Sequence, residues 1–125
     1  MNINLMSDTY ILEPSENPTL TGNFTTLLGM KEPLTCSSTG GSPPAQLEWF
    51  LDDGTEAVEI DDETNSTQDV SVLLYTPRKL HNGSDIVCKA TQDGGSSYRE
   101  EKQQLIVLCK YILKYNNHIV TEKTI

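Results

Sequence analysis

The chain has 125 residues, which is room for one domain with its own hydrophobic core. Its 9 lysines and arginines stand against 18 aspartates and glutamates, so the net charge is −9. That charge excludes binding to a nucleic-acid backbone or directly to an anionic membrane surface. The mean hydropathy of −0.40 fits a folded globular domain, and no apolar run approaches the ~18 residues that span a bilayer.

Short apolar runs alternate along the chain with clusters of Gly, Pro, Asn and Asp, which predicts strands joined by turns. The clearest alternation is in 46–51, where Leu47, Trp49 and Leu51 fall on one face. Regularly spaced short strands predict a β-sandwich or a barrel. In chain order we expect strands near 19–21, 31–38, 46–51, 57–60, 70–76, 85–90 and 104–108.

The segment 98–113 also has features of a helix, because 98–104 is rich in helix formers. The apolar residues that follow are contiguous rather than spaced every three or four, which favours a strand there. We expect an N-terminal extension over 1–13, the folded domain over 14–108 and an irregular C-terminal tail over 109–125.

Cys36, Trp49 and Cys88 each lie near the centre of an expected strand. This order and spacing are typical of immunoglobulin sandwiches, in which the indole packs on a bridge between the two sheets. The alternative is a set of buried free thiols beside one core tryptophan, since cysteine is often buried without a bond.

Three stretches carry a family resemblance: PSENPTLTG, EPLTCSSTGGSPPAQLEWFLDDG and DVSVLLYTPRKLHNGSDIVCKA. They resemble the constant-type immunoglobulin domains of cell-surface adhesion receptors such as nectins, SynCAMs and the nephrin/Kirre group. The resemblance covers about residues 14–107. It implies an all-β, two-sheet antiparallel sandwich of about seven strands, with a Cys36–Cys88 disulfide and Trp49 in the core.

Two features depart from that pattern. Many immunoglobulin domains have a tyrosine two residues before the second cysteine, and here that position is Ile86. The turn before this strand must therefore be held by another interaction. The segment 54–68 is short and acidic, which leaves no room for the additional edge strands of a variable-type domain.

Asn23, Asn65 and Asn82 begin N-glycosylation sequons, whereas Asn17 precedes a proline and does not. All three lie in expected turns or strand ends, and together they suit a secretory route. Asn82 is the weakest candidate, since its turn with Gly83 serves the backbone geometry.

The inventory of reactive residues predicts no enzyme. His81 and His118 are the only histidines, and the sequence has neither a nucleophile elbow nor a phosphate-binding glycine loop. The acidic residues between 52 and 63 lack the spacing of an EF-hand, so we expect a solvated edge and no metal or cofactor. Cys109 is expected to stay outside the disulfide or to pair between chains.

The expected function is recognition of another protein, with the domain forming part of the extracellular face of a longer membrane receptor. Glu48 and Phe50 point outward from the central strand and are candidates for the interface; alternatively, a neighbouring strand covers Phe50. Any membrane anchor would lie outside this chain, which we therefore expect to be a fragment of a longer protein. The alternatives are a secreted immune-type binding protein and an intracellular structural immunoglobulin module.

Overall fold

The computed structural model of the chain describes residues 12–60, 62–115 and 118–124, with side chains described as far as residue 109. Strands dominate these residues, and two single 3-10 turns join them. The elements are β1 (Thr19–Thr21), β2 (Thr25–Leu27), β3 (Glu32–Ser37), β4 (Gln46–Asp52), β5 (Ala57–Glu59), β6 (Thr64–Ser66), β7 (Val70–Tyr75), η2 (Lys79–His81), β8 (Asp85–Gln92), η3 (Asp93–Gly95), β9 (Ser97–Gln104), β10 (Ile106–Tyr115) and β11 (His118–Thr124).

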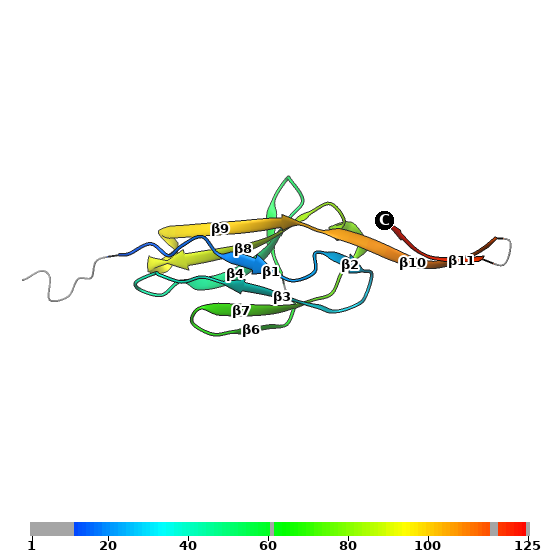
Figure 1. Cartoon of the computed structure of the whole chain (residues 1–125). Helices are drawn as coiled ribbons and strands as arrows, with labels where there is room; N and C mark the ends of the chain where they lie inside the picture. Colours follow the sequence, from blue (N-terminus) through cyan, green and yellow to red (C-terminus); the bar gives the residue numbers. More distant parts are fainter. Residues whose placement is uncertain (1–11, 61, 116–117, 125) are drawn as a thin grey trace, which may run out of the picture.

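Two four-stranded antiparallel sheets pack into a sandwich (Figure 1). One sheet has the order β1-β3-β7-β6 and the other the order β5-β4-β8-β9. A third sheet, β11-β10-β2, joins the start of β10 in parallel to β2. The expected all-β immunoglobulin sandwich is confirmed, and the part of the chain that the structure describes contains no helix able to cross a membrane.

The acidic segment 54–68 contains the strand expected near 57–60 and a second strand, β6, that the sequence did not predict. β5 adds an edge strand to one sheet by pairing with β4, and β6 adds one to the other sheet by pairing with β7. Each has three residues, all of them exposed. Because each strand has only three residues, both edge strands fit within this short segment, where longer ones would not.

The core forms where the inward faces of both sheets meet around a disulfide. Cys36 on β3 and Cys88 on β8 are bonded with their Cα atoms 6.4 Å apart, within the usual reach of a disulfide. Trp49 is the register partner of Cys88 and is 3% exposed. Burying each large apolar side chain of this core stabilises the fold by roughly 1.5–3 kcal/mol. The core also contains Leu34, Leu73, Tyr75, Ile86 and Leu105, all without solvent exposure.

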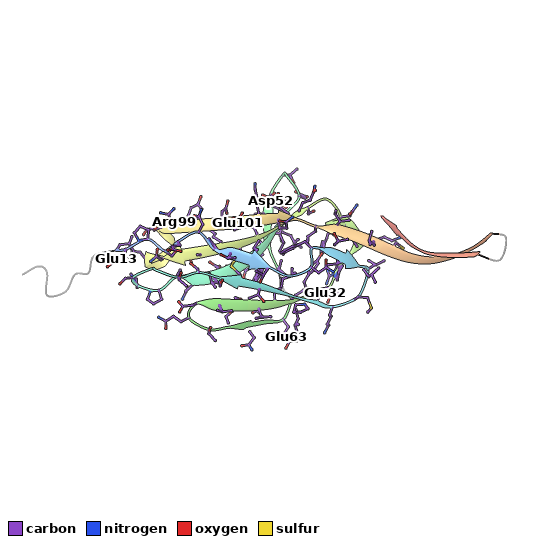
Figure 2. The ribbon with its side chains drawn as sticks, viewed as in Figure 1. Glu13, Glu32, Asp52, Glu63, Arg99 and Glu101 are labelled. Carbon is purple, nitrogen blue, oxygen red and sulfur yellow. A yellow bond between two sulfur atoms is a disulfide. The ribbon has the colours of Figure 1, made fainter. Side chains whose placement is uncertain are left out.

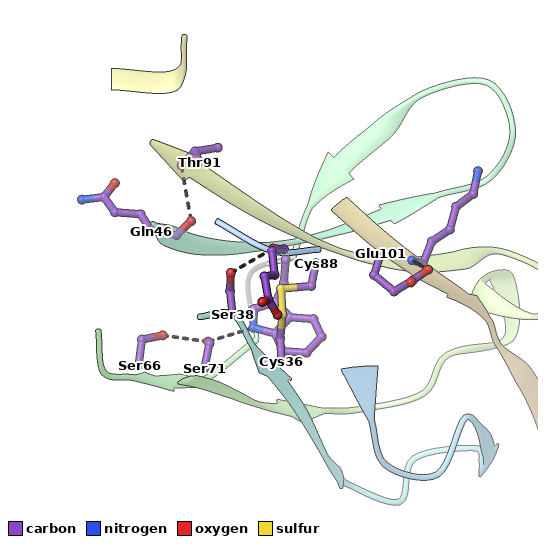
Figure 3. The surroundings of a disulfide bond; sticks show 11 residues. Cys36, Ser38, Gln46, Ser66, Ser71, Cys88, Thr91 and Glu101 are labelled. Atoms are coloured by element: carbon purple, nitrogen blue, oxygen red, sulfur yellow. Dashed lines mark hydrogen bonds between the residues drawn. A yellow bond between two sulfur atoms is a disulfide. The ribbon is translucent and has the colours of Figure 1, made fainter. Parts of the chain in front are cut away.

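The buried indole has a hydrogen-bond partner on the opposite sheet. Trp49 Nε1 donates to Ser71 Oγ at 2.9 Å, and Ser71 Oγ lies 2.7 Å from Ser66 Oγ. Figure 3 shows this chain of polar groups beside the Cys36–Cys88 bond. A buried N–H without a partner costs about 1–3 kcal/mol, so Ser71 allows a tryptophan in this position.

The turn between β7 and β8 is held by a pair that replaces the missing tyrosine. Ile86 is completely buried and belongs to the hydrophobic core. Tyr75, at the end of β7, places its hydroxyl 2.9 Å from Nδ1 of His81 in η2, and the two rings stack with centroids 5.7 Å apart. The tyrosine that anchors this corner therefore comes from the strand before the turn rather than the strand after it.

The C-terminal part of the chain decides one open alternative and corrects one expectation. The segment 98–104 is strand β9 because all of it pairs with β8, and this pairing overrides its helix propensity. The irregular tail expected over 109–125 is wrong: β10 continues to Tyr115 and pairs antiparallel with β11. This hairpin projects from the sandwich (Figure 1). The remaining domain boundaries stay predictions, and residues 1–11 of the expected extension lie outside the described residues.

A single buried amide ties the N-terminal segment to the sandwich. Gln92, at the end of β8, is 4% exposed; its Oε1 accepts from the Ser15 N–H at 2.9 Å. Its Nε2 donates to the carbonyls of Glu13 and Pro43. Gly41 leaves room for this amide, because a Cβ there would lie 2.7 Å from Nε2 of Gln92. The side chain of Gln92 thus joins the end of β8 to the N-terminal segment and to the turn that contains Pro43.

The arrangement around Gln92 predicts that Gln92→Glu is strongly destabilising. The substitution replaces the NH₂ group with a carboxylate oxygen that faces two carbonyl oxygens, and a buried charge left without a partner costs about 3–5 kcal/mol. Urea unfolding at pH 7 measures the loss. Gln103→Glu, on exposed β9, is the control and should change the free energy of unfolding by less than about 0.5 kcal/mol. Equal effects in the two variants would contradict the role of Gln92.

Candidate recognition face on the β5-β4-β8-β9 sheet

The outer face of the β5-β4-β8-β9 sheet is built from residues that alternate with the core residues. On β4, Leu47, Trp49 and Leu51 pack inward, so Glu48 and Phe50 face outward. The register places these two beside Lys89 and Val87 of β8. The outward residues form cross-strand rows: Gln46, Thr91 and Tyr98; Glu48, Lys89 and Glu100; and Phe50, Val87 and Lys102.

Phe50 lies at the apolar centre of this face. It is half-buried and pairs with Glu59 on one side and Val87 on the other, and Val87 is only 5% exposed. Phe50 and Val87 line a shallow depression of about 100 Å³ whose sides include Lys89 and Lys102. Neighbouring strands thus cover part of the ring, while its remaining surface borders a hollow open to solvent.

Charged groups of both signs surround this apolar centre. Glu48, Lys89 and Glu100 follow one another across three strands, so each acid neighbours a base. The ammonium of Lys89 lies 4.2 Å from the centre of the Tyr98 ring, a cation–π distance. Tyr98 is 56% exposed and adds a second aromatic surface to the face. Protein–protein interfaces are enriched in aromatic residues at an apolar core and have a polar rim, an arrangement that this face shares.

The edge of the sheet remains accessible beside this face. Every residue of β9 from Tyr98 to Gln104 is exposed, and Arg99 and Glu101 project from this strand in Figure 2. Charged side chains along an edge oppose unspecific pairing with other strands. The outer face, rather than the strand edge, is therefore the candidate surface for recognition.

The three sequons occupy different environments. Asn23 is exposed between β1 and β2, and its Oδ1 accepts from the Thr25 N–H at 3.1 Å. Asn65 is exposed on β6 and faces outward, because its neighbour Ser66 bonds inward to Ser71. Asn82 is half-buried, and its Oδ1 accepts from the backbone N–H of Val107 at 2.9 Å. None of the three lies on the strands of the recognition face.

The described residues contain no cluster of three or more His, Cys, Asp and Glu side chains that could hold a metal ion. His81 is buried against Tyr75, and the side chain of His118 lies outside the described part of the chain. Cys109 does not take part in the disulfide.

The surroundings of His81 in the β7–β8 corner favour the neutral form of its imidazole. Burial is the main reason that the pKa of His81 is lowered, and the charge of Arg78 lowers it further, against a raising effect of Asp62. Burial raises the pKa of the Tyr75 hydroxyl, and the Asp62 carboxylate adds to this rise. The neutral imidazole can thus accept the proton of the Tyr75 hydroxyl at Nδ1.

Sequence reasoning missed the polar side chains that hold this scaffold. Ser71 and Tyr75 fall in a strand where two apolar faces read equally well, so the inward set was ambiguous. Gln92 follows an alternating run as its next inward position, which is the one signal that could have marked it as buried.

Comparison with known proteins identifies the family. Residues 11–99 match the CD80-like C2-set immunoglobulin domain. The chain belongs to this family. Junctional adhesion molecule A of Rattus norvegicus is 27% identical over 100 residues, which cover 73% of this chain and 33% of that protein. The C2-set assignment agrees with the resemblance to constant-type domains of adhesion receptors, and such relatives are recognition domains rather than enzymes.

Solved structures agree with the C2-set assignment. The crystal structure of Rst D1-D2 has a TM-score of 0.59 and 28% identity, covering 77% of this chain and 50% of that chain. The mouse nectin-like molecule 4 ectodomain has a TM-score of 0.55 at 18% identity, covering 84% of this chain and 40% of that one, and supports the fold alone. The C2-set chain thus spans about a third of its rat relative and half of Rst D1-D2.

The lowered pKa of His81 predicts that this C2-set domain loses stability in mild acid. Below the unfolded-state pKa near 6.5, the unfolded chain binds a proton more readily than the folded chain, so the free energy of unfolding falls as pH decreases. His81→Gln should flatten this dependence between about pH 7.5 and 5. Urea unfolding of the wild type and of His81→Gln over this range tests it. Identical slopes in wild type and His81→Gln would show that His81 titrates normally.

Proposed function

We propose that the chain is an extracellular recognition module of a cell-surface adhesion or signalling receptor, and that it binds another protein through the outer face of the β5-β4-β8-β9 sheet. The module performs no catalysis. The observation that carries the proposal is the combination of an aromatic centre, a mixed-charge rim and the absence of sequons on this one face.

The cysteine chemistry supports the extracellular location. The Cys36–Cys88 bond closes a loop of 52 residues at the centre of the core, and such bonds persist in oxidising compartments. A bridge over a loop of this length stabilises the fold by roughly 4 kcal/mol in the chain-entropy model. The domain is therefore suited to the cell surface, where it would keep this stabilisation.

The positions of the sequons support the choice of face. Asn65 points away from the sandwich on the β1-β3-β7-β6 sheet, and Asn23 lies between β1 and β2. Glycans at these positions would cover the opposite sheet and its margin. The face around Phe50 would stay open to a protein partner.

The charge pattern indicates the kind of partner. Alternating acids and bases along the Glu48, Lys89 and Glu100 row suit a partner surface that also alternates in sign. The sheet face of another immunoglobulin-type domain has the flat shape and the extent that this surface could meet. The name of the rat relative, a junctional adhesion molecule, agrees with contact between cell surfaces.

Sequon occupancy is the first prediction from this proposal. In a mammalian secretory host we expect glycans at the exposed Asn23 and Asn65 and none at Asn82, because the amide of Asn82 is half-buried and held in place by the Val107 N–H. Glycopeptide mass spectrometry of the wild type tests all three sites. Removal of glycans by a glycosidase should lower the apparent mass of the wild type and of Asn82→Gln, but not that of the double variant Asn23→Gln/Asn65→Gln. Bare Asn23 and Asn65 in secreted protein would contradict the prediction.

The second prediction concerns the face itself. Beads coated with the secreted, oxidised chain should bind cells that display immunoglobulin-type ectodomains, and Phe50→Asp should weaken this binding by about tenfold or more because it places a charge at the apolar centre. Glu48→Lys should weaken it by disrupting the charge pattern. Val70→Asp, an equivalent change on the outer face of the opposite sheet, is the control.

Circular dichroism and thermal unfolding show that each variant is folded before binding is compared. Binding that survives Phe50→Asp and Glu48→Lys but is lost in Val70→Asp would assign recognition to the other sheet. Recovery of the natural protein from cytosol with Cys36 and Cys88 reduced would overturn the extracellular assignment.

A further inference from the structure

An apolar groove lies between β5, its adjoining loops and the β7–β8 corner, separate from the Phe50 depression. Its volume is about 380 Å³, which is in the range of pockets that hold small ligands or single side chains of a peptide. Leu51 and Ile60 line it as half-buried residues. His81 and Ser84 line it as buried ones.

Two aliphatic side chains on this groove are strongly exposed. Leu80 of η2 is 78% exposed and Val58 of β5 is 54% exposed, and both line the groove. Leu80 lies in the middle of η2, and the residue after it, His81, is held by its hydrogen bond with Tyr75. The backbone at Leu80 is therefore held in place while its side chain stays exposed. Covering such side chains removes apolar surface from water at about 25 cal/mol per Å².

The lining of the groove is acidic. Four carboxylates and one guanidinium line it, from Asp53, Glu56, Glu59, Asp62 and Arg78. Two of the acids are held in place: Asp53 accepts bonds from Thr55 and Glu56, which lower its pKa, and Asp62 Oδ2 accepts from the Thr76 N–H at 2.9 Å. The groove thus combines an apolar interior with a predominantly acidic rim.

We propose that this groove binds a short segment of a partner protein in which an aliphatic side chain is flanked by lysine or arginine. The aliphatic side chain would pack between Leu80, Val58 and Ile60, and the flanking cations would face the acidic rim. Charge complementarity carries the choice of occupant, because the same rim repels anionic lipid and acidic peptides. This contact is additional to the one proposed for the outer face, since Phe50 does not line the groove.

The test uses the whole oxidised chain and a blocked synthetic peptide with leucine at its centre and arginines on both sides. Titration followed by ¹⁵N–¹H spectra should shift the amides of Val58, Leu80 and His81. A peptide with alanine at its centre should bind about tenfold more weakly, and one with glutamates in place of the arginines should not bind. Equal binding of the leucine and alanine peptides would mean attraction by charge alone and would overturn the proposal.

Variants of the chain separate the groove from other surfaces. Leu80→Ser and Glu56→Lys should each weaken peptide binding about tenfold, and both residues are exposed, so the fold should survive either change. Val70→Ser is the matched control, because Val70 is an exposed aliphatic residue at the start of β7, at the other end of this strand from the β7–β8 corner. Phe50→Asp should leave peptide binding unchanged, so failure of the outer-face proposal would not affect this one. Binding that is unaffected by Leu80→Ser, or shifts that map away from Val58 and Leu80, would overturn the groove assignment.

Discussion

The disulfide between Cys36 and Cys88 is the constraint on which the rest of the domain depends. It joins the central strands of the two sheets, and the register partner of Cys88 is Trp49. The indole then reaches across to Ser71 on β7, so a covalent bond and a hydrogen bond both connect the sheets at one level. Because these two bonds set which residues of the central strands face the core, the alternation of side chains along each strand then determines which others face inward and which form the outer surfaces.

Polar side chains secure both ends of the sandwich where strand pairing stops. At one end, Gln92 binds backbone groups of the N-terminal segment and of the turn after β3. At the other, Tyr75 holds His81, and Asn82 caps the N–H of Val107 at the start of β10. Buried polar groups are expensive when unsatisfied, so each of these arrangements specifies one path for the chain as well as adding stability.

The same corner connects the stability of the fold to the proposed groove. His81 anchors the η2 turn, and the preceding residue, Leu80, is the most exposed large apolar side chain among the described residues. The turn thus holds a solvent-exposed apolar side chain beside a rim of carboxylates. The outer face around Phe50 offers a different chemistry, with acids and bases in alternation. A C2-set domain with both surfaces could contact a flat partner and a basic peptide segment at once.

The sequence alone determined the class of fold, because Cys36, Trp49 and Cys88 carry their meaning in spacing and in local alternation. It also placed Glu48 and Phe50 on an outer face, since alternation with Trp49 leaves no other choice. Only the tertiary structure decided which face of 70–75 is buried, because Val72 and Leu74 are as apolar as Leu73 and Tyr75. It also decided that 98–104 is a strand and that 109–115 continues one. The first of these segments is a strand because it pairs with β8, and the second because it pairs with β11; a strand's partners cannot be read from its own residues.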